Sequence, residues 1–468
     1  MRRTSLLLLT ALLAAPLFGA ESSPPSPGPE FFAAHRAAFE AKIPPGSVAI
    51  LRAAPEGSAE VDALFRQSSD FWYLTGLTEP GATAVFAPGA PQGSRFLLFV
   101  HPRDFAQEQW TGWRTGTEGA TKDFHADAAF PLDDFWKKLP ELEKGRRMLL
   151  FSAGGDAAFR DRLLEAWRAG DAQSAELRPA ADAGPILHQM RLVKDATEQA
   201  LLRRAAELSA AGHVAAMKET RPGQYEYALR AALEATCTRG RAARTAYPSI
   251  VGSGPNSVIL HYERDDRRMN AGETIVNDSA CEYGMYAADV TRSYPVSGKF
   301  SPEQRAIYDL VLRAQKAGFA KIRPGAEFHE VHDATVGVIV DGLLALGILH
   351  GDRAEVMKNR SYTAFYPHGS SHWLGMNVHD AGSYAYANPD APRLERYSLA
   401  QARLAPGMAF TVEPGIYIRE HADGVDAKWW NIGVRIEDDV LVTPEGMECL
   451  SCAAPREAAD VEKAIRGR

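Results

Sequence analysis

Residues 273–294 read ETIVNDSACEYGMYAADVTRSY, and this stretch decides what the carboxyl-terminal half of the chain builds. Two apolar runs typical of β-strands flank a short turn sequence, so the stretch predicts an antiparallel hairpin. With the turn centred on Tyr283-Gly284, Asp278 and Asp289 stand directly opposite one another, with Cβ atoms about 4.5–5.5 Å apart. Two like charges at that spacing destabilise a sheet unless a proton or a cation lies between them. The alternatives are a pair of exposed acids on a hairpin and a carboxylate pair that shares a proton.

A second group of candidate residues lies in the stretch 365–380, FYPHGSSHWLGMNVHD. It holds three of the thirteen histidines of the chain, His368, His372 and His379, within twelve positions. A regular strand points residues an odd number of positions apart to opposite faces, so His372 and His379 reach one site only if the chain bends. Gly375 is the candidate for that bend. Taken singly, each histidine is more often a structural residue than a ligand.

Two further acids interrupt apolar, strand-like runs: Glu413 in AFTVEPGIY (409–417) and Glu437 in GVRIEDDV (433–440). A charge in such a run is almost never buried unless it is paired or bound to a metal. With the two aspartates of the hairpin they provide four carboxylates, and the histidines add one or more imidazoles. Hard oxygen ligands with one nitrogen suit Mn²⁺, Co²⁺ or Zn²⁺ in a two-metal site. Two such ions activate water and polarise a carbonyl, so the pattern predicts hydrolytic chemistry.

The composition excludes several classes of function. The 468 residues are 46% hydrophobic and 24% charged, which is typical of a soluble globular protein. The net charge of −7 favours neither a nucleic acid nor an anionic membrane as partner. Residues 252–257 lack the third glycine of a dinucleotide loop, His329 and His332 miss the HExxH spacing by one residue, and the sequence has no GxSxG elbow.

Residues 31–185 alternate short strand-like runs with helical ones. Buried strands are predicted at 46–51, 84–87, 95–100 and 148–151, and residues 157–169 are helical in character. This alternation predicts a layered α/β domain, and it carries no chemistry of its own.

Residues 192–465 form a second predicted domain. A possible capping box, Asp195 to Glu198, opens a helix that ends before Arg-Pro-Gly at 221–223, and a second helical run follows. The same order recurs from Ser301, through Arg-Pro-Gly at 323–325, to another helical run. We infer a duplicated helix–helix–sheet unit. The alternative is that Pro-Gly commonly ends helices, and two tripeptides do not exclude it.

The first 20 residues are expected to lie outside the fold. Arg2 and Arg3 precede a largely apolar stretch, 6–20, and a Pro/Ser-rich leader follows over 21–30. This order is typical of a secretory signal peptide, and the apolar stretch is too short to span a bilayer comfortably. We expect an exported protein, periplasmic or secreted, without membrane attachment after signal removal; a retained anchor is the alternative.

Four cysteines are too few for a disulfide framework in a chain of this length. Cys237 and Cys281 are solitary in the sequence, and we expect each to be a small core residue. Cys449 and Cys452 form a CxxC motif, for which a local disulfide and two unrelated buried thiols are equally compatible.

Together these motifs resemble those of the pita-bread metallopeptidases. The order of motifs matches: an aspartate at 278, DVTR at 289–292, HGSSH at 368–372, TVEPG at 411–415 and RIEDD at 435–439. The pattern is most similar to that of the Xaa-Pro aminopeptidases (aminopeptidase P). Residues 73–76 and 110–114 also resemble the amino-terminal domain of these enzymes. The resemblance covers residues 31–465 and implies an α+β fold, with a smaller α/β domain before the pita-bread catalytic domain. Creatinase shares the fold but lacks the metal ligands, so the intact ligand set argues against a creatinase.

The resemblance implies a role for each of the five ligand-type residues. Asp289 and Glu437 would bridge two divalent metal ions, Asp278 would complete one ion, and His372 with Glu413 would complete the other. A bridging hydroxide would attack the carbonyl before proline, with Glu413 as general acid and base. The imide nitrogen of an Xaa-Pro bond carries no hydrogen, so a proton must be delivered to it as it leaves. The expected metal is Mn²⁺, with Co²⁺ and Zn²⁺ as alternatives.

Four more residues match functional positions of the family. His261 and His379 match histidines that contact substrate, His368 matches one that lines the proline pocket, and Arg435 matches one that organises the site. One departure is Ala280, because the family usually has glycine two residues after the first metal-binding aspartate. This change is expected to alter the backbone there and to leave the carboxylate in place.

The resemblance implies hydrolysis of the first peptide bond in peptides with proline at the second position. One alternative is a prolidase, which acts only on Xaa-Pro dipeptides. Another is a non-catalytic, peptide-binding pita-bread protein, but such proteins typically lose ligand residues. Family members are usually dimers or tetramers, so the resemblance also implies a homo-oligomer.

Overall fold

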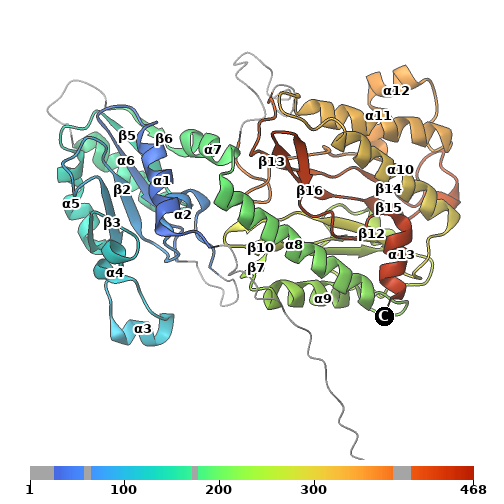
Figure 1. Ribbon diagram of the computed structural model, residues 1–468, viewed down its shortest axis with the longest axis horizontal. Helices are drawn as coiled ribbons and strands as arrows, with labels where there is room; N and C mark the ends of the chain where they lie inside the picture. Colours follow the sequence, from blue (N-terminus) through green and yellow to red (C-terminus); the bar gives the residue numbers. More distant parts are fainter. Residues whose placement is uncertain (1–25, 57–64, 171–177, 383–401, 468) are drawn as a thin grey trace, which may run out of the picture.

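The computed structural model describes residues 26–56, 65–170, 178–382 and 402–467. A smaller amino-terminal part and a larger carboxyl-terminal part are joined by α7 (Gly184–Leu192), which lies between them (Figure 1). The predicted signal peptide, 1–20, lies outside the described residues, as do residues 21–25 of the predicted leader. Helix α1 (Pro29–Glu40) begins within the last two residues of that leader.

A six-stranded sheet in the order β4-β3-β2-β1-β5-β6 forms the centre of the amino-terminal part. Its strands are β1 (Ser47–Arg52), β2 (Thr83–Phe86), β3 (Phe96–Val100), β4 (Ala128–Pro131), β5 (Met148–Ser152) and β6 (Ala180–Asp182). The helices after α1 are α2 (Ser69–Thr75), α3 (Phe105–Thr111), α4 (Gly116–Lys122), α5 (Phe135–Glu143) and α6 (Ala157–Ala169). Helices cover both faces of the sheet. Residues along β1 alternate in direction, so Ala49 and Leu51 pack with α1 and α2, while Val48 and Ile50 pack with α5 and α6.

Two long helix pairs cover the strands of the carboxyl-terminal part (Figure 1). The pairs are α8 (Ala196–Glu219) with α9 (Glu226–Arg239), and α10 (Pro302–Phe319) with α11 (His329–Ala345). Reciprocal capping boxes start α8 at Asp195 and α10 at Ser301, as the sequence predicts. Two shorter helices are α12 (Arg353–Asn359) and α13 (Ala458–Arg466). Within the described ranges, no helix combines the length and apolar character needed to cross a membrane.

The described strands of this part form four small sheets, β12-β9-β8, β11-β10-β7, β13-β16-β17 and β14-β15. They are β7 (Arg244–Thr245), β8 (Ile250–Ser253), β9 (Thr274–Asp278), β10 (Cys281–Tyr283), β11 (Tyr286–Ala287), β12 (Thr291–Pro295), β13 (Ala409–Val412), β14 (Gly415–Ile418), β15 (Ile432–Arg435), β16 (Asp438–Thr443) and β17 (Gly446–Cys449). Short 3-10 turns occur at Leu132–Asp134, Gly254–Val258, Ser361–Ala364 and Ala427–Trp429. Strands follow each helix pair along the chain, which is the order expected of a duplicated helix–helix–sheet unit.

The predicted hairpin forms, but its predicted register is wrong by two residues. Asp278 pairs with Thr291, not with Asp289. The turn lies at Gly284-Met285, where both residues adopt positive φ angles of 56° and 70°, as a two-residue hairpin turn requires. Asp289 is therefore a diagonal neighbour of Asp278, and side chains two positions apart on a strand still point to the same face.

Cys237 and Cys281 are core residues, as expected, but the expectation that they are solitary is wrong. They form a disulfide with a Cα–Cα distance of 5.5 Å across 44 positions of sequence, because the end of α9 packs beside β10. Cys449 and Cys452 form a second disulfide, one of the two alternatives that the CxxC motif left open.

Candidate metal centre

One cavity of about 300 Å³ gathers all nine residues that the sequence singles out. They are Asp278, Asp289, His372, Glu413, Glu437, His261, His368, His379 and Arg435. These residues come from stretches that are far apart in the sequence, so the fold itself brings them together.

Strand ends deliver the four carboxylates to this cavity. Asp278 is the last residue of β9, and Asp289 lies just before β12. Glu413 directly follows β13, and Glu437 directly precedes β16. His372 lies beside them because the backbone N–H of Thr411 in β13 donates to its carbonyl at 3.0 Å.

The ligand-type atoms lie close enough to share a cation. Nε2 of His372 lies 3.3 Å from Oδ2 of Asp289 and 3.5 Å from Oε1 of Glu413. One ligand atom each from Asp289, His372 and Glu437 lie within 4.8 Å of one another. This is an oxygen-rich set with one imidazole nitrogen.

Crowding of buried carboxylates gives the cavity its electrostatic character. Burial, then the charges of Asp289 and Glu413, raise the pKa of Glu437 well above its ordinary value. Burial also raises the pKa of Asp278, against the opposing charge of Arg435. Such groups repel one another unless a cation lies among them. Divalent cations would relieve this repulsion and would find the hard oxygen donors that they prefer, so the residues present fit a site for divalent ions.

His372 behaves as a partner of these acids. Its burial acts to lower its pKa, but the hydrogen bond to Asp289 and the charge of Glu413 outweigh burial and raise the pKa to about 9. Its other ring nitrogen, Nδ1, lies 3.1 Å from the carbonyl oxygen of Trp373. That contact orients the ring so that Nε2 faces the carboxylates.

The predicted bend at Gly375 is confirmed. The chain turns there, with the Gly375 N–H donating to the carbonyl of Asn377 at 3.2 Å. The rings of His372 and His379 meet edge to face, with centroids 4.3 Å apart. A Cβ atom at position 375 would collide with the carboxylate of Asp380, so the close approach needs glycine.

Three residues that the sequence reasoning missed hold the carboxylates in place. The hydroxyl of Tyr247 donates to Asp278 Oδ1 at 2.5 Å, and Thr291 Oγ1 donates to Glu437 Oε2 at 2.6 Å. Asp439 accepts the backbone N–H of Asp289 at 3.1 Å. Asp439 could have been found from the sequence, because it is the third acid in the apolar run that begins at residue 433. Nothing in the sequence around Tyr247 marks it as a site residue.

Arg435 and His368 also line the cavity. Arg435 donates to Asp278 Oδ2 at 2.6 Å and to the hydroxyl of Tyr417 at 2.8 Å. That hydroxyl also lies 2.9 Å from Nε2 of His368. Burial, followed by the charge of Arg435, lowers the pKa of His368 to about 3, so its imidazole is neutral.

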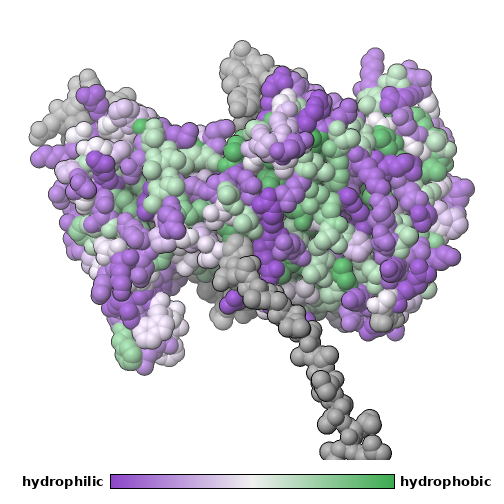
Figure 2. Space-filling model, in the orientation of Figure 1, coloured by the Kyte–Doolittle hydropathy of each residue, from purple (hydrophilic) through white to green (hydrophobic). Residues whose placement is uncertain are grey.

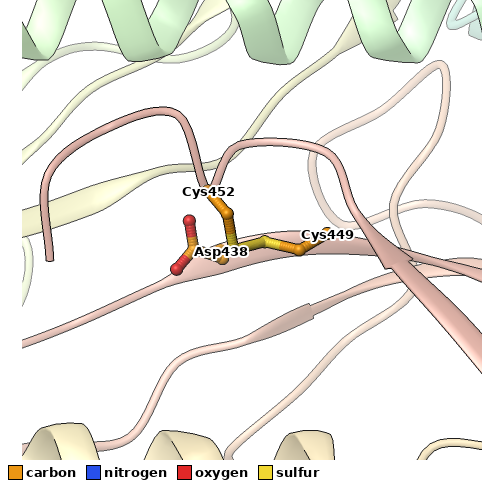
Figure 3. Close-up of side chains that lie close together, drawn as sticks. All are labelled: Asp438, Cys449 and Cys452. Atoms are coloured by element: carbon orange, nitrogen blue, oxygen red, sulfur yellow. A yellow bond between two sulfur atoms is a disulfide. The ribbon is translucent and has the colours of Figure 1, made fainter.

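A second group of potential metal ligands, Asp438 with Cys449 and Cys452, does not form a comparable site (Figure 3). Its two sulfur atoms are joined in the disulfide. The Asp438 carboxylate accepts from Arg292 at 2.6 Å and from Ser451 at 2.7 Å. The two sulfur atoms and the Asp438 carboxylate are therefore already engaged in other interactions.

Comparison with known proteins gives consistent matches over most of the chain. Residues 200–444 match metallopeptidase family M24, and residues 32–151 match the aminopeptidase P amino-terminal domain. The Xaa-Pro aminopeptidase of Escherichia coli is 38% identical over 439 residues, which cover 92% of this chain and 96% of that protein. The structure of Pseudomonas aeruginosa aminopeptidase PepP superposes with a TM-score of 0.89 at 42% identity, over 95% of this chain and 99% of the other. Zinc-substituted E. coli aminopeptidase P in complex with product gives a TM-score of 0.88 at 36% identity, over 94% and 99%.

Proposed function

The chain belongs to metallopeptidase family M24, and on that premise we propose that it is an Xaa-Pro aminopeptidase. It hydrolyses the bond between the first residue of a peptide and a proline at the second position. The observation that carries this proposal is the convergence of nine separately recognised residues on one cavity, in a chain that matches Xaa-Pro aminopeptidases over nearly its whole length.

Five residues would hold two divalent ions in this proposal. Asp289 and Glu437 would serve both ions, Asp278 would complete one, and His372 with Glu413 would complete the other. When bound, the ions supply an activated water and polarise the scissile carbonyl. We propose Mn²⁺ as the native metal, because four carboxylates and one imidazole form a hard, oxygen-rich set; Co²⁺ and Zn²⁺ are the alternatives.

Glu413 moves the proton that the reaction requires. The imide nitrogen before the departing proline has no hydrogen, so it must receive a proton as the bond breaks. Glu413 faces the cavity with its two oxygens 3.5 Å from His372 Nε2 and 3.5 Å from His368 Nδ1. It is therefore placed to accept a proton from the attacking water and to pass it to the leaving nitrogen.

The remaining residues bind and orient the peptide. His261 and His379 contact the substrate, and neutral His368, braced by Tyr417, lines the pocket for proline. Arg435 organises the site, because it links Asp278 to Tyr417 through its guanidinium.

A metal-reconstitution assay tests this function. The metal-free protein is supplied with Mn²⁺, Co²⁺ or Zn²⁺ and given Gly-Pro-Ala and Gly-Pro, and the products are identified by mass spectrometry. Release of glycine from the tripeptide supports the proposal, and Glu413→Ala should abolish it. Cleavage restricted to Gly-Pro would make the protein a prolidase, and binding of either peptide without cleavage would make it a peptide-binding protein.

We also propose that the protein is exported to the periplasm or secreted, with residues 1–20 removed and no membrane attachment afterwards. Two disulfides support an oxidising compartment, since disulfides are rare in the reducing cytosol. The amino-terminal sequence of the protein, isolated from fractionated cells, tests this proposal. A start near residue 21 in a soluble extracytoplasmic fraction is expected, and an intact start at Met1 would contradict it.

We propose two domains, 31–185 and 192–465, and a homo-oligomer, dimeric or tetrameric. The short helix α3 projects from the amino-terminal part (Figure 1 and Figure 2). Its neighbourhood leaves three large apolar side chains, Phe105, Trp110 and Trp113, 72%, 87% and 78% exposed. Exposed aromatic groups of this kind mark interaction surfaces. Light scattering after size exclusion tests the assembly, and a mass of one chain would contradict it.

The proposed binding partner is a peptide substrate with proline at the second position, and not a nucleic acid.

A further inference from the structure

The loop that carries His379 is held from outside the catalytic part. We call residues 375–380 the His379 loop. Two residues of the amino-terminal part contact it directly: Ser69, the first residue of α2, and Arg66, three positions before it. Ser69 Oγ donates to Oδ1 of Asn377 at 2.8 Å, and Arg66 donates to the carbonyl of Met376. The guanidinium of Arg66 also donates to Glu282 at 2.7 Å, so it reaches the catalytic hairpin as well.

A buried charge bridge anchors the end of the same loop. Arg191, in the connecting helix α7, donates through Nη1 to Asp70 of α2 at 2.7 Å and through Nη2 to Asp380. Lys194 Nζ lies 3.6 Å from the other oxygen of Asp380. The side chains of Arg191, Lys194 and Asp380 are 3%, 1% and 1% exposed, and that of Asp70 is 13% exposed.

This arrangement requires an arginine with two carboxylates. A guanidinium presents its donors in a rigid planar fork and can bind two acids at once, whereas an ammonium is a single point charge. With Lys194, the bridge contains two cations and two carboxylates in a nearly water-free setting. Removal of one carboxylate leaves an uncompensated buried cation, which pulls the remaining groups out of place.

The buried charge bridge is directly connected to the loop that carries His379. Asp380 follows His379 directly, and the Asp380 N–H donates to the carbonyl of Trp373 at 2.8 Å. Asp380 Oδ1 also accepts the N–H of Asn377 at 3.3 Å, which closes the loop on itself. The position of the Asp380 carboxylate therefore sets where the His379 ring stands beside His372.

We propose that Arg191 and Asp70 are positioning residues for the proposed reaction: through Asp380 they fix the His379 loop and so aim His379 at the substrate. This inference rests on the proposed function, because His379 contacts the peptide only under that proposal. Under this proposal the amino-terminal part contributes directly to the alignment of the substrate.

Asp70→Asn is the main test, because it removes one charge and keeps the shape of the side chain. With Mn²⁺ supplied, kcat/KM for Gly-Pro-Ala should fall at least about 10-fold, since small misplacements of a contacting group cost large factors in rate. Metal content should remain that of the wild type. Arg191→Lys, which keeps the charge but lacks the fork, should show a similar loss and covers the case in which Asp70→Asn folds poorly. His35→Gln is the matched control: it cuts another contact between the two parts, His35 Nε2 to Asp195 Oδ2 at 3.3 Å, and should leave kcat/KM unchanged.

A double-mutant cycle separates positioning from general stabilisation. In a His379→Ala background, Asp70→Asn should cause no further loss, because residues that act through one another are not additive. Hydrogen exchange of a peptide spanning 373–380 should speed up in Asp70→Asn and remain unchanged in His35→Gln.

Wild-type kcat/KM in both Asp70→Asn and Arg191→Lys, or full additivity of Asp70→Asn with His379→Ala, would overturn the inference and leave the proposed function standing. Absence of tripeptide cleavage by the metal-loaded wild type would overturn the proposed function, and the positioning role with it.

Discussion

The two parts of the chain differ in how deeply they bury charge. The described core of the amino-terminal part consists mainly of apolar side chains such as Val48, Leu98 and Trp167, all fully buried, while its charged residues Arg36 and Glu143 remain 7% and 5% exposed. The described core of the carboxyl-terminal part also encloses Arg292 and Glu437, which are 0% and 2% exposed. A buried charge costs free energy unless it is paired. The core of the amino-terminal part therefore serves mainly to stabilise the fold, whereas the core of the carboxyl-terminal part also holds the charged groups of the cavity.

Removing one carboxylate from the cavity tests this contrast most strongly. Glu437→Gln should lower kcat/KM by about 10⁴-fold or more, because residues that act as one unit lose most of their joint effect together. In metal-free protein the same change should raise the melting temperature, because it removes one of the repelling acids around Asp289. Peptide assays with added Mn²⁺ and thermal unfolding in chelator measure the two effects. A metal-free variant less stable than the wild type would show that the acids do not strain the cavity.

Arg292 tests the paired charges behind the cavity. Its guanidinium donates to Asp438 at 2.6 Å and to the carbonyls of Glu437 at 2.6 Å and Ala454 at 3.1 Å. Arg292→Met should lower the free energy of unfolding by about 3–5 kcal/mol, because it leaves the buried Asp438 carboxylate with only the more distant Arg456, 3.5 Å away, as a cation partner. Denaturant unfolding provides the measurement. As a control, Arg103→Met breaks the ion pair with Glu108 at the protein surface and should change stability by less than about 1 kcal/mol.

Buried His213 makes the carboxyl-terminal part sensitive to acid. Its Nε2 lies 3.0 Å from the carbonyl of Ser279 and 2.9 Å from that of Val290, the residues that follow the two aspartates of the hairpin. Burial, then the charge of Arg292, lowers its pKa to about 4. Between pH 6.5 and 4 the unfolded chain binds this proton and the folded chain does not, so stability falls as the pH falls.

The contribution of His213 to this loss should reach about 3 kcal/mol near pH 4. Above pH 6.5 the imidazole is neutral in both states and contributes no pH dependence. His213→Gln, which keeps a side-chain donor, should flatten this part of the pH–stability curve. An equally steep curve for the variant would assign the acid sensitivity to other groups.

The sequence predicted what is local and missed what depends on distant packing. The capping boxes at Asp195 and Ser301 need only residues three positions apart, so they could be read directly. Ligand-type acids such as Glu413 were found because a charge inside an apolar run has few explanations. The hairpin register was missed because it depends on Met285 adopting a positive φ angle, which side chains of its kind rarely do. The Cys237–Cys281 disulfide was missed because it depends on how α9 packs against β10.

The bridge from Asp70 through Arg191 to Asp380 belongs to this second class. Its members lie 121 and 189 positions apart, and each is unremarkable in its own stretch. No periodicity or spacing rule relates residues at such separations. Only the folded chain shows that Asp70 of the amino-terminal part is linked through Arg191 to the residue that follows His379.

Asp156 provides the smallest and most discriminating test, because it is an acid of the amino-terminal part without that coupling. Its carboxylate caps α6 by accepting the N–H of Phe159 at 2.9 Å, and it lies 3.5 Å from Arg52 Nε. Asp156→Ala should lower the free energy of unfolding by about 1 kcal/mol, the usual cost of a lost cap. Asp156→Asn keeps a capping oxygen and should cost less. Neither change should alter kcat/KM for an Xaa-Pro tripeptide, in contrast to Asp70→Asn. A loss of activity at Asp156 equal to that at Asp70 would mean that any disturbance of the sheet reaches the cavity, and the specific bridge through Arg191 would no longer be needed to explain the coupling.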